Sequence, residues 1–367
     1  MAGPCPMKII TVVGARPQFI KAAAVSREIA RRPAIREIIV HTGQHFDRNM
    51  SEIFFEEMEI PRPAYHLEVN SLGHGAMTGR MIEKIEEVLL QERPDILMVY
   101  GDTNSTLAGA LAARKLHVRV VHVEAGLRSF NMRMPEEINR ILTDRISDIL
   151  CCPTETAVEN LRREGFGNFP CSIVRTGDVM QDAALYYGAR SADKSTIIRD
   201  LRLADREYAL CTIHRAENTD DPARLKGLFS ALLEIGNDLP VVMPLHPRTQ
   251  KLAAALGPRL SGDDRLIILP PVGYFDMIEL LKRTAIVLTD SGGLQKEAYF
   301  FRKICLTLRE ETEWTELVDC HVNVVVGAEK DRIVHAFREA VHAPLPPCAS
   351  LYGDGNASAL IVDALSG

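Results

Sequence analysis

The sequence predicts an α/β fold in which doubly wound parallel β-sheets are divided over two domains. The chain has 367 residues, and an ordinary domain has roughly 100–200. Short β-branched runs alternate from end to end with longer segments of helical apolar spacing. Apolar strands separated by helices form parallel sheets with right-handed crossovers.

Eleven apolar runs are expected to be strands, which is too many for one small sheet. Their ranges are 8–14, 37–43, 96–102, 118–126, 148–153, 172–178, 208–214, 240–246, 266–271, 285–293 and 304–308. The polar loop GFGNFPC precedes the expected boundary, so one domain covers 1–175 and the other 176–350.

The composition excludes several classes of function. Hydrophobic residues make up 46% of the chain, and its net charge is -6, from 49 acids against 43 lysines and arginines. Nucleic-acid binding in general needs a basic surface, so we expect no nucleic-acid partner. No apolar stretch approaches the ~18 residues of a membrane span, and the first apolar run is too short for a signal peptide. We expect a cytoplasmic protein without a membrane partner.

The cysteines do not indicate a metal site. The chain contains no CxxC pair or zinc-type Cys/His spacing, and several cysteines lie inside the apolar runs DILCCP, YALCTI and KICLTL. They are expected to be small buried hydrophobic residues in a reducing compartment.

Polar clusters follow nearly every predicted strand. They include GARP, TGQH, GDTNST, EAGLRS, IHRAEN, HPR and DSGG. Ligands of open parallel sheets bind at the carboxyl ends of the strands. Clusters in both halves of the chain therefore indicate a cleft between two facing domains.

The segment DSGGLQKEA follows a buried strand and opens a helix. Ser291, Gly292 and Gly293 let a phosphate approach the N–H groups of the helix N-terminus, where the dipole favours an anion. One turn on, Glu297 can accept hydrogen bonds from ribose hydroxyls. The alternative is a capped turn with Glu297 as a surface acid.

The segment GARPQFIK repeats this architecture after the first strand. Arg16 suits a phosphate by bidentate contact, and Lys21 is either a second cation for the ligand or a lysine on the helix surface. No G-x-G-x-x-G and no P-loop occurs, so neither a dinucleotide cofactor nor ATP hydrolysis is expected.

Three acids, Asp102, Glu124 and Glu136, are candidates for proton transfer. A carboxylate placed directly after a buried strand is partly desolvated, which raises its pKa towards general acid/base use. Alternatively, Asp102 caps a helix and Glu136 pairs with Arg140 one turn on.

Two histidines, His214 and His246, follow strands of the second half, each near an arginine. This pattern fits a diphosphate site better than a core position. No HxH, HExxH or DxD pattern supports a metal.

These ordered motifs resemble the non-hydrolysing UDP-N-acetylglucosamine 2-epimerases. The match also includes PEEINR, PTETAVENL, TGDVMQDA and the terminal YGDGNAS. The resemblance implies the GT-B architecture of two facing Rossmann-like domains, with the C-terminal helix, residues 351–367, completing the first. It also implies a homodimer.

The resemblance implies an isomerase that needs no cofactor or metal. UDP is eliminated across C1–C2 of the sugar and then re-adds to the opposite face. The family's acid/base carboxylates map onto Asp102, Glu124 and Glu136, and its catalytic histidine maps onto His214. Its UDP contacts map onto Arg16, Lys21, His246, Ser291, Gly292, Gly293 and Glu297.

Two loops depart from the family pattern. Residues 129–134 read SFNMRM instead of a Tyr-Ser-Pro element, and residues 312–316 read TEWTE. They look like the subgroup acting on UDP-2,3-diacetamido-2,3-dideoxy-glucuronate, a precursor of surface polysaccharide. A sugar carboxylate requires a cation, for which the candidates are Arg133, Arg140 and Arg309.

A further departure concerns regulation. Many family members hold an activating UDP-sugar with a Gln-His-Arg segment, whereas this chain has Gln44, His45 and Phe46. This difference argues against activation by that sugar. The competing functions are a GT-B glycosyltransferase, a hydrolysing epimerase and a UDP-sugar-binding regulator without catalysis.

Overall fold

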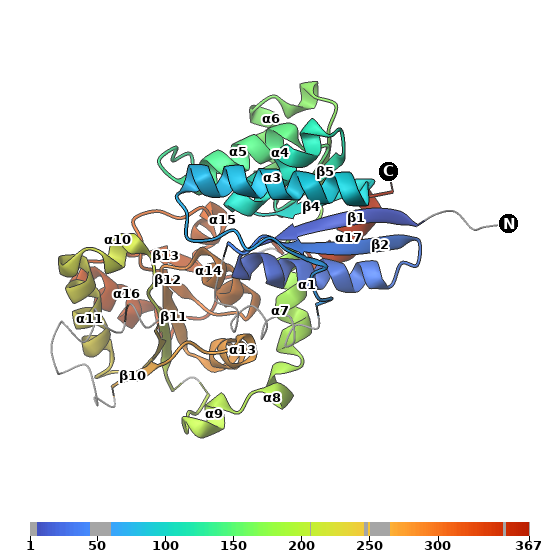
Figure 1. Ribbon diagram of the computed structural model, residues 1–367. Coiled ribbons are helices and arrows are strands. Elements are labelled where there is room, and N and C mark those ends of the chain that lie inside the picture. The colour runs from blue at the N-terminus through green and yellow to red at the C-terminus, as the bar shows by residue number, and fades with distance from the viewer. Residues whose placement is uncertain are drawn as a thin grey trace. The chain divides into compact units, whose positions relative to one another are not determined.

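The computed structural model describes residues 6–44, 60–205, 207–245, 249, 265–347 and 350–366. Contacts between residues divide the chain into two compact units. The first runs to Ala183 and resumes at Ser350, and the second lies between Ala184 and Ala349. Figure 1 follows the chain by colour through both units.

The first unit is built on a seven-stranded sheet of order β3-β2-β1-β4-β5-β6-β7. Every pair of neighbouring strands is parallel. The strands are β1 (Met7–Val13), β2 (Ile35–His41), β3 (Tyr65–His66), β4 (Ile96–Tyr100), β5 (Arg119–Val123), β6 (Ile149–Cys152) and β7 (Ser172–Arg175).

Helices cover both faces of this sheet (Figure 1). On one face, α3 and α4 pack on alternate residues of the strands, and α5 packs beside α4. On the other face, α1 packs against the C-terminal helix α17, whose first N–H groups donate to the Asp182 carboxylate. The helices are α1 (Arg16–Ala30), α3 (His74–Glu92), α4 (Asn104–Lys115), α5 (Pro135–Ile146), α6 (Glu155–Arg163), η1 (Phe166–Asn168), α7 (Val179–Gly188) and α17 (Ala357–Ala364).

The second unit is built on a six-stranded parallel sheet of order β10-β9-β8-β11-β12-β13. The strands are β8 (Ala209–Thr212), β9 (Val241–Pro244), β10 (Leu266–Leu269), β11 (Ile286–Thr289), β12 (Cys305–Thr307) and β13 (Asn323–Val325). Successive residues of β8 enter different cores, because a strand's side chains alternate between the two faces. Cys211 packs under α11 and α16, whereas Leu210 packs under α13 and α14.

The helices of the second unit lie between these strands in the sequence. They are α8 (Ser191–Lys194), α9 (Ile197–Asp200), α10 (Ala216–Thr219), α11 (Pro222–Ile235), α13 (Tyr274–Arg283), α14 (Gly292–Phe300), α15 (Thr315–Asp319) and α16 (Lys330–Ala340).

The predicted α/β class with parallel sheets is confirmed, and a strand forms in each of the eleven predicted runs. The edge strands β3 and β13 were not predicted, because two or three residues are too few to show an apolar period. The cysteines of the three apolar runs, Cys151, Cys152, Cys211 and Cys305, are free and buried as expected. Among the described residues, no helix is long and apolar enough to cross a membrane.

Each sheet has one point at which the strand order reverses direction. In the first unit the chain goes outward from β1 to β2 and β3, and then returns to β4 on the other side of β1. In the second unit the same reversal separates β8 from β11. The carboxyl ends of strands at such a switch point form the usual ligand crevice of an open α/β sheet.

Candidate active site

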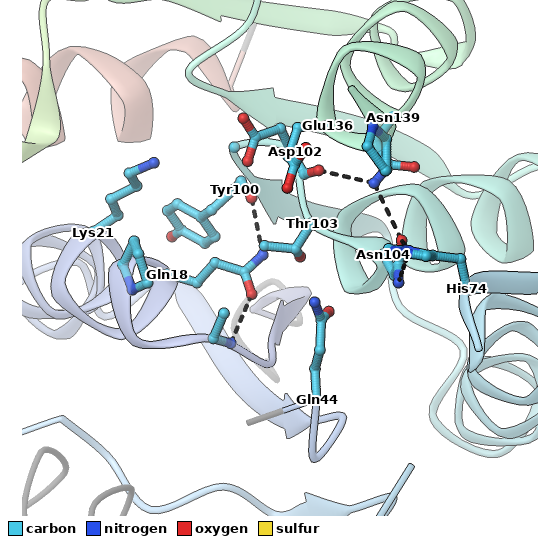
Figure 2. Close-up of a pocket in the computed structure, with 14 residues that line it drawn as sticks. Gln18, Lys21, Gln44, His74, Tyr100, Asp102, Thr103, Asn104, Glu136 and Asn139 are labelled. Atoms are coloured by element: carbon cyan, nitrogen blue, oxygen red, sulfur yellow. Dashed lines mark hydrogen bonds between the residues drawn. The ribbon is translucent and has the colours of Figure 1, made fainter. Parts of the chain in front are cut away.

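A pocket of about 220 Å³ opens at the switch point of the first unit. Fourteen residues line it, and among them are three of the predicted site residues, Lys21, Asp102 and Glu136. They come from α1, the end of β4 and the start of α5 (Figure 2). The fold thus brings together side chains that are far apart in the sequence.

Gln18 holds two of the turns at this pocket, and only its place in GARPQFIK could have indicated it from the sequence. Its side-chain oxygen accepts from the N–H groups of Gly14 and Ala15 at 2.8 and 3.0 Å. Its amide nitrogen donates to the Tyr100 carbonyl at 2.9 Å and to the Thr106 hydroxyl at 3.0 Å. This buried amide therefore ties the end of β1 to the end of β4.

Asp102 stands at the end of β4 with its side chain one-third exposed, at 34%. The expected alternative, in which Asp102 caps the next helix, is wrong, because the N-cap of α4 is Thr103. Arg140 Nη1 lies 2.9 Å from Asp102 Oδ2. Removal of the carboxylate from water raises the pKa of Asp102, and the nearby Arg140 and Lys21 cations only partly oppose this.

Glu124 pairs with Lys21 inside the first unit. The ammonium of Lys21 donates to Glu124 Oε2, and both side chains are 9% exposed, so Lys21 is not a helix-surface lysine. A Cβ on Gly101 would lie 3.1 Å from both charged atoms, which explains a glycine at this position. Glu124 itself has a φ of 74°, in the region that favours glycine.

Glu136 and Glu137 open α5 and have different environments. Glu136 is half-buried and lines the pocket. Glu137 is buried and accepts from the backbone N–H groups of Ser129 and Phe130, at 3.0 and 2.9 Å. It also pairs with Arg140 at 2.9 Å.

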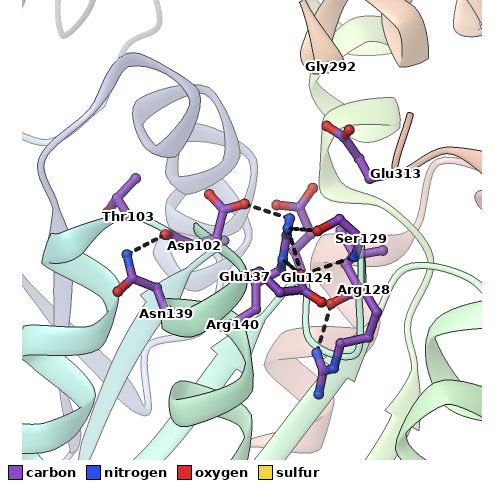
Figure 3. Close-up of polar contacts among 12 residues, drawn as sticks. Asp102, Thr103, Glu124, Arg128, Ser129, Glu137, Asn139, Arg140, Gly292 and Glu313 are labelled. Carbon is purple, nitrogen blue, oxygen red and sulfur yellow. Dashed lines mark hydrogen bonds and ion pairs between the residues drawn. The ribbon is translucent and has the colours of Figure 1, made fainter. Parts of the chain in front are cut away.

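The guanidinium of Arg140 lies between two carboxylates, those of Asp102 and Glu137 (Figure 3). Arg140 was a candidate for binding the sugar, but in the structure its guanidinium forms ion pairs with these two protein carboxylates. Arg133 is exposed and is not among the residues that line the pocket. The helix α1 begins at Arg16, whose side chain lies outside the described residues.

The switch point of the second unit holds His214 at the end of β8. Its Nδ1 lies 3.0 Å from Oδ1 of Asp290, which follows the neighbouring strand β11. The carboxylate orients the ring through Nδ1, and the side chain is 53% exposed. His246, predicted to contact UDP, lies outside the described residues.

Asp290 is fully buried and organises this turn. It accepts from the N–H groups of His214 and Arg215 at 3.1 and 3.0 Å and from the Asn218 amide at 3.1 Å. Burial alone would raise the pKa of Asp290, but these donors and the His214 ring outweigh it and lower the pKa. Asp290 was not among the predicted site residues, although it is the first residue of the segment DSGGLQKEA and follows a strand that adjoins that of His214.

Ser291 caps the next helix, α14, by accepting from the Leu294 N–H at 3.4 Å. A Cβ on Gly292 would meet the Glu313 carboxylate at 2.3 Å, whereas Gly293 is exposed and has room for one. The helix N-terminus is therefore close to a carboxylate on one side and exposed at Gly293.

Two other predicted residues of the second unit are buried and paired. Glu297 accepts from the Tyr274 hydroxyl at 3.1 Å, so it is not a surface acid. Arg309 pairs with Glu313 at 2.9 Å. Burial would raise the pKa of Glu313, but Arg309 outweighs this effect and lowers it. The charge of Arg309 is thus balanced within the protein.

Metal binding finds no support in the part of the chain that the structure describes. No three or more His, Cys, Asp and Glu side chains there are grouped closely enough to hold an ion.

Two Rossmann-like units with polar groups at their switch points define a two-domain α/β protein of the nucleotide-binding kind. The sequence profile described as UDP-N-acetylglucosamine 2-epimerase matches residues 27–366. The chain is 55% identical over 362 residues to the UDP-2,3-diacetamido-2,3-dideoxy-D-glucuronate 2-epimerase of Pseudomonas aeruginosa, covering 98% of this chain and 99% of that one. This chain belongs to the UDP-N-acetylglucosamine 2-epimerase family, as its motifs indicated.

Solved structures agree with this assignment and confirm the predicted fold class. The Methanocaldococcus jannaschii UDP-GlcNAc 2-epimerase in complex with UDP-GlcNAc and UDP superposes with a TM-score of 0.90 at 40% identity, covering 98% of this chain and 99% of that one. The Neisseria meningitidis enzyme bound to UDP-GlcNAc gives 0.88 at 31% identity, covering 98% and 100%. The chain is accordingly a UDP-sugar 2-epimerase, an isomerase.

Proposed function

We propose that the protein inverts C2 of a UDP-linked 2-acetamido sugar by eliminating UDP and adding it back. The observation that carries this proposal is the pocket at the first switch point, which Lys21, Asp102 and Glu136 line. Glu124 is joined to it through its ion pair with Lys21. A C2 proton is only weakly acidic, so its removal requires a positioned base and a stabilised leaving group together.

The reaction balances without a cofactor. A base takes the C2 proton, the C1–O bond breaks, and a C1=C2 double bond remains while UDP departs with the electron pair. UDP then re-adds to C1 as an acid protonates C2 from the opposite face. Asp102, Glu124 and Glu136 supply the acid and base of these two faces. His214, oriented by Asp290, assists at the departing diphosphate.

The two domains divide this work. The first, residues 1–175 with 351–367, supplies the acid and base groups and two cations for UDP, and the second, 176–350, supplies the other UDP contacts. The UDP contacts are Arg16, Lys21, His246, Ser291, Gly292, Gly293 and Glu297. The exposed Gly293 N–H at the start of α14 is suited to a phosphate oxygen, because the helix dipole favours an anion there.

The sugar is the diacetamido-uronate rather than UDP-N-acetylglucosamine. The 55% identical relative carries that substrate in its name. Carboxylates balance the charges of Arg140 and Arg309. Among the described side chains, none forms an ion pair with Arg133, so this cation of the divergent loop 129–134 is the one suited to a sugar carboxylate.

Incubation of the enzyme with each UDP-sugar in deuterium oxide, without an acceptor, tests both statements. From the uronate we expect deuterium at C2 and both epimers. Arg133→Gln should exchange the C2 hydrogen of the uronate more slowly than the wild type. Turnover of UDP-N-acetylglucosamine alone would overturn the choice of sugar. Absence of C2 exchange from both would indicate a glycosyltransferase or a binding protein, and release of free sugar would indicate a hydrolysing epimerase.

The protein works in the cytoplasm as a homodimer. Its product, the epimerised UDP-sugar, is used in the synthesis of surface polysaccharide. Support for an interface comes from two large apolar side chains one turn apart on α5, Ile138 and Leu142, which are 40% and 46% exposed. Light scattering tests the oligomeric state. A wild-type monomer at working concentration would contradict the homodimer. A dimer that becomes a monomer in Leu142→Glu would place the interface at α5.

A further inference from the structure

A buried charged cluster lies beneath the two turns that present Asp102 and Glu124. His122 precedes Glu124 by two residues on β5, and its side chain is fully buried. Its Nδ1 lies 2.6 Å from Oδ1 of Asp144, and its Nε2 lies 2.7 Å from the carbonyl oxygen of Gly101. The histidine thus connects α5 to the end of the neighbouring strand β4.

These two contacts define which ring nitrogens carry protons. A carbonyl oxygen can only accept, so Nε2 of His122 must donate to Gly101. Asp144 is ionised, because it balances the charge of the buried Arg128, whose Nη1 lies 2.7 Å from its second oxygen. The same oxygen accepts from the Gly126 N–H at 3.1 Å. Nδ1 therefore donates as well, and the ring is an imidazolium.

The charges of the cluster support this state. Burial would raise the pKa of Asp144, but His122 and then Arg128 outweigh burial and lower it. Arg128 also pairs with Glu164 at 2.6 Å. Two cations and two anions balance, whereas an unpaired buried charge would be strongly unfavourable.

The cluster holds both turns in conformations that need support. Gly101 has a φ of 63° and Glu124 a φ of 74°, and a left-handed non-glycine residue is strained unless its surroundings hold it. His122 fixes the carbonyl of Gly101, the residue before Asp102. Asp144 fixes the N–H of Gly126, two residues after Glu124.

We propose that His122 is a positioning residue that works as an imidazolium, holding the Asp102 turn through Gly101 and the Glu124 turn through Asp144. This inference rests on the proposed function, because it concerns the residues that orient the acid and base groups. Neither His122 nor Asp144 contacts the pocket, since neither is among its lining residues.

Nitrogen-15 NMR of protein labelled at its histidine rings tests the proton state without any measurement of activity. At neutral pH we expect both ring nitrogens of His122 to bear protons, with the signals assigned by their loss in a His122 variant. One unprotonated ring nitrogen in the His122 signals would overturn the imidazolium. If the wild type exchanges no C2 hydrogen, the proposed function fails while this measurement still decides the proton state.

Substitution tests the positioning role. The amide nitrogen of His122→Asn can replace Nδ1 only, and that of His122→Gln can replace Nε2. We expect kcat to fall on the order of 10²-fold in His122→Asn, since small misplacements of reacting groups have effects of this size. KM should change little, and His122→Gln should recover part of kcat.

The matched control is His117→Asn, at the exposed end of the chain leading into β5, where φ is 59° and asparagine is tolerated. Its kcat and KM should equal those of the wild type. A folded His122→Asn with unchanged kcat would overturn the positioning role. If that variant does not fold, a fully active His122→Gln would overturn it instead, because this side chain cannot replace the contact of Nδ1 with Asp144.

Discussion

The two switch points share one topology but present different chemistry. At the first, between β1 and β4, Asp102 and Glu136 line a pocket, and Asp102 and the nearby Glu124 have cations as partners. At the second, between β8 and β11, a histidine and a helix N-terminus lie beside the buried acid Asp290. The crevice is therefore a property of the sheet, whereas its chemistry depends on which residues end the strands.

The two aspartates at these points show what decides their chemistry. Burial acts in the same direction on both, raising the pKa. For Asp102 that effect dominates, and the carboxyl is suited to proton transfer. For Asp290 the His214 ring, and then the Asn218 and Arg215 N–H groups, outweigh burial and lower the pKa, so the acid remains ionised and structural. The groups that oppose burial, more than burial itself, separate these two aspartates.

The largest expected effect comes from Asp102→Asn at the first switch point. We expect kcat to fall on the order of 10³-fold, as for loss of a general acid or base, with UDP affinity unchanged in calorimetry. The control is Asp95→Asn, because Asp95 is exposed at the opposite end of β4. If Asp102→Asn lost as much UDP affinity as is expected of Asp290→Asn, the contrast between the two units would be wrong.

Asp290→Asn at the second switch point should have the next largest effect. Loss of the charge that orients His214 is expected to lower kcat/KM on the order of 10²-fold, and UDP affinity should fall as well. Since the pKa of Asp290 is lowered in the fold, its stabilising contribution is present above the ordinary Asp range and is lost as the pH falls through the folded value.

Two measurements check this second prediction. Calorimetry with UDP compares the variant with Asp238→Asn, an exposed position at the amino end of β9. Acid unfolding should show that Asp290→Asn has lost part of the pH dependence of the wild type. Unchanged UDP affinity together with unchanged acid unfolding would contradict the structural role of Asp290.

A smaller effect is expected from Arg140→Gln, which removes the main cation that lowers the pKa of Asp102. The pKa of this carboxyl should then rise further. The limb of the pH–rate profile that Asp102 sets should move to higher pH, whether it acts as base or acid. Arg140→Lys keeps the charge and should leave the limb nearly in place. Movement to lower pH would mean that burial does not govern Asp102.

Most of the fold could be predicted from the sequence, because long apolar runs and helical periods are local signals. The edge strands β3 and β13 could not be predicted. Their few residues form strands only because they pair with the backbone of the neighbouring strand. The predicted residues Asp102, Lys21 and Glu136 do line one pocket. Each lies in a segment that comes after a strand of the same parallel sheet, so all three are near the carboxyl edge of that sheet. Their supporting partners Gln18 and Asp144 carry no comparable local signal.

The sequence by itself determined the fold class, the family and the positions at strand ends where charged groups gather. Only the tertiary structure decided which of those charges neutralise each other. Lys21 pairs with an acid 103 residues away, and Arg140 pairs with one 38 residues away. Such pairings depend on distances of a few ångströms between neighbouring strands and helices, and charge interactions of this kind leave no periodic signature in the chain. They leave Arg133 as the exposed cation of its loop.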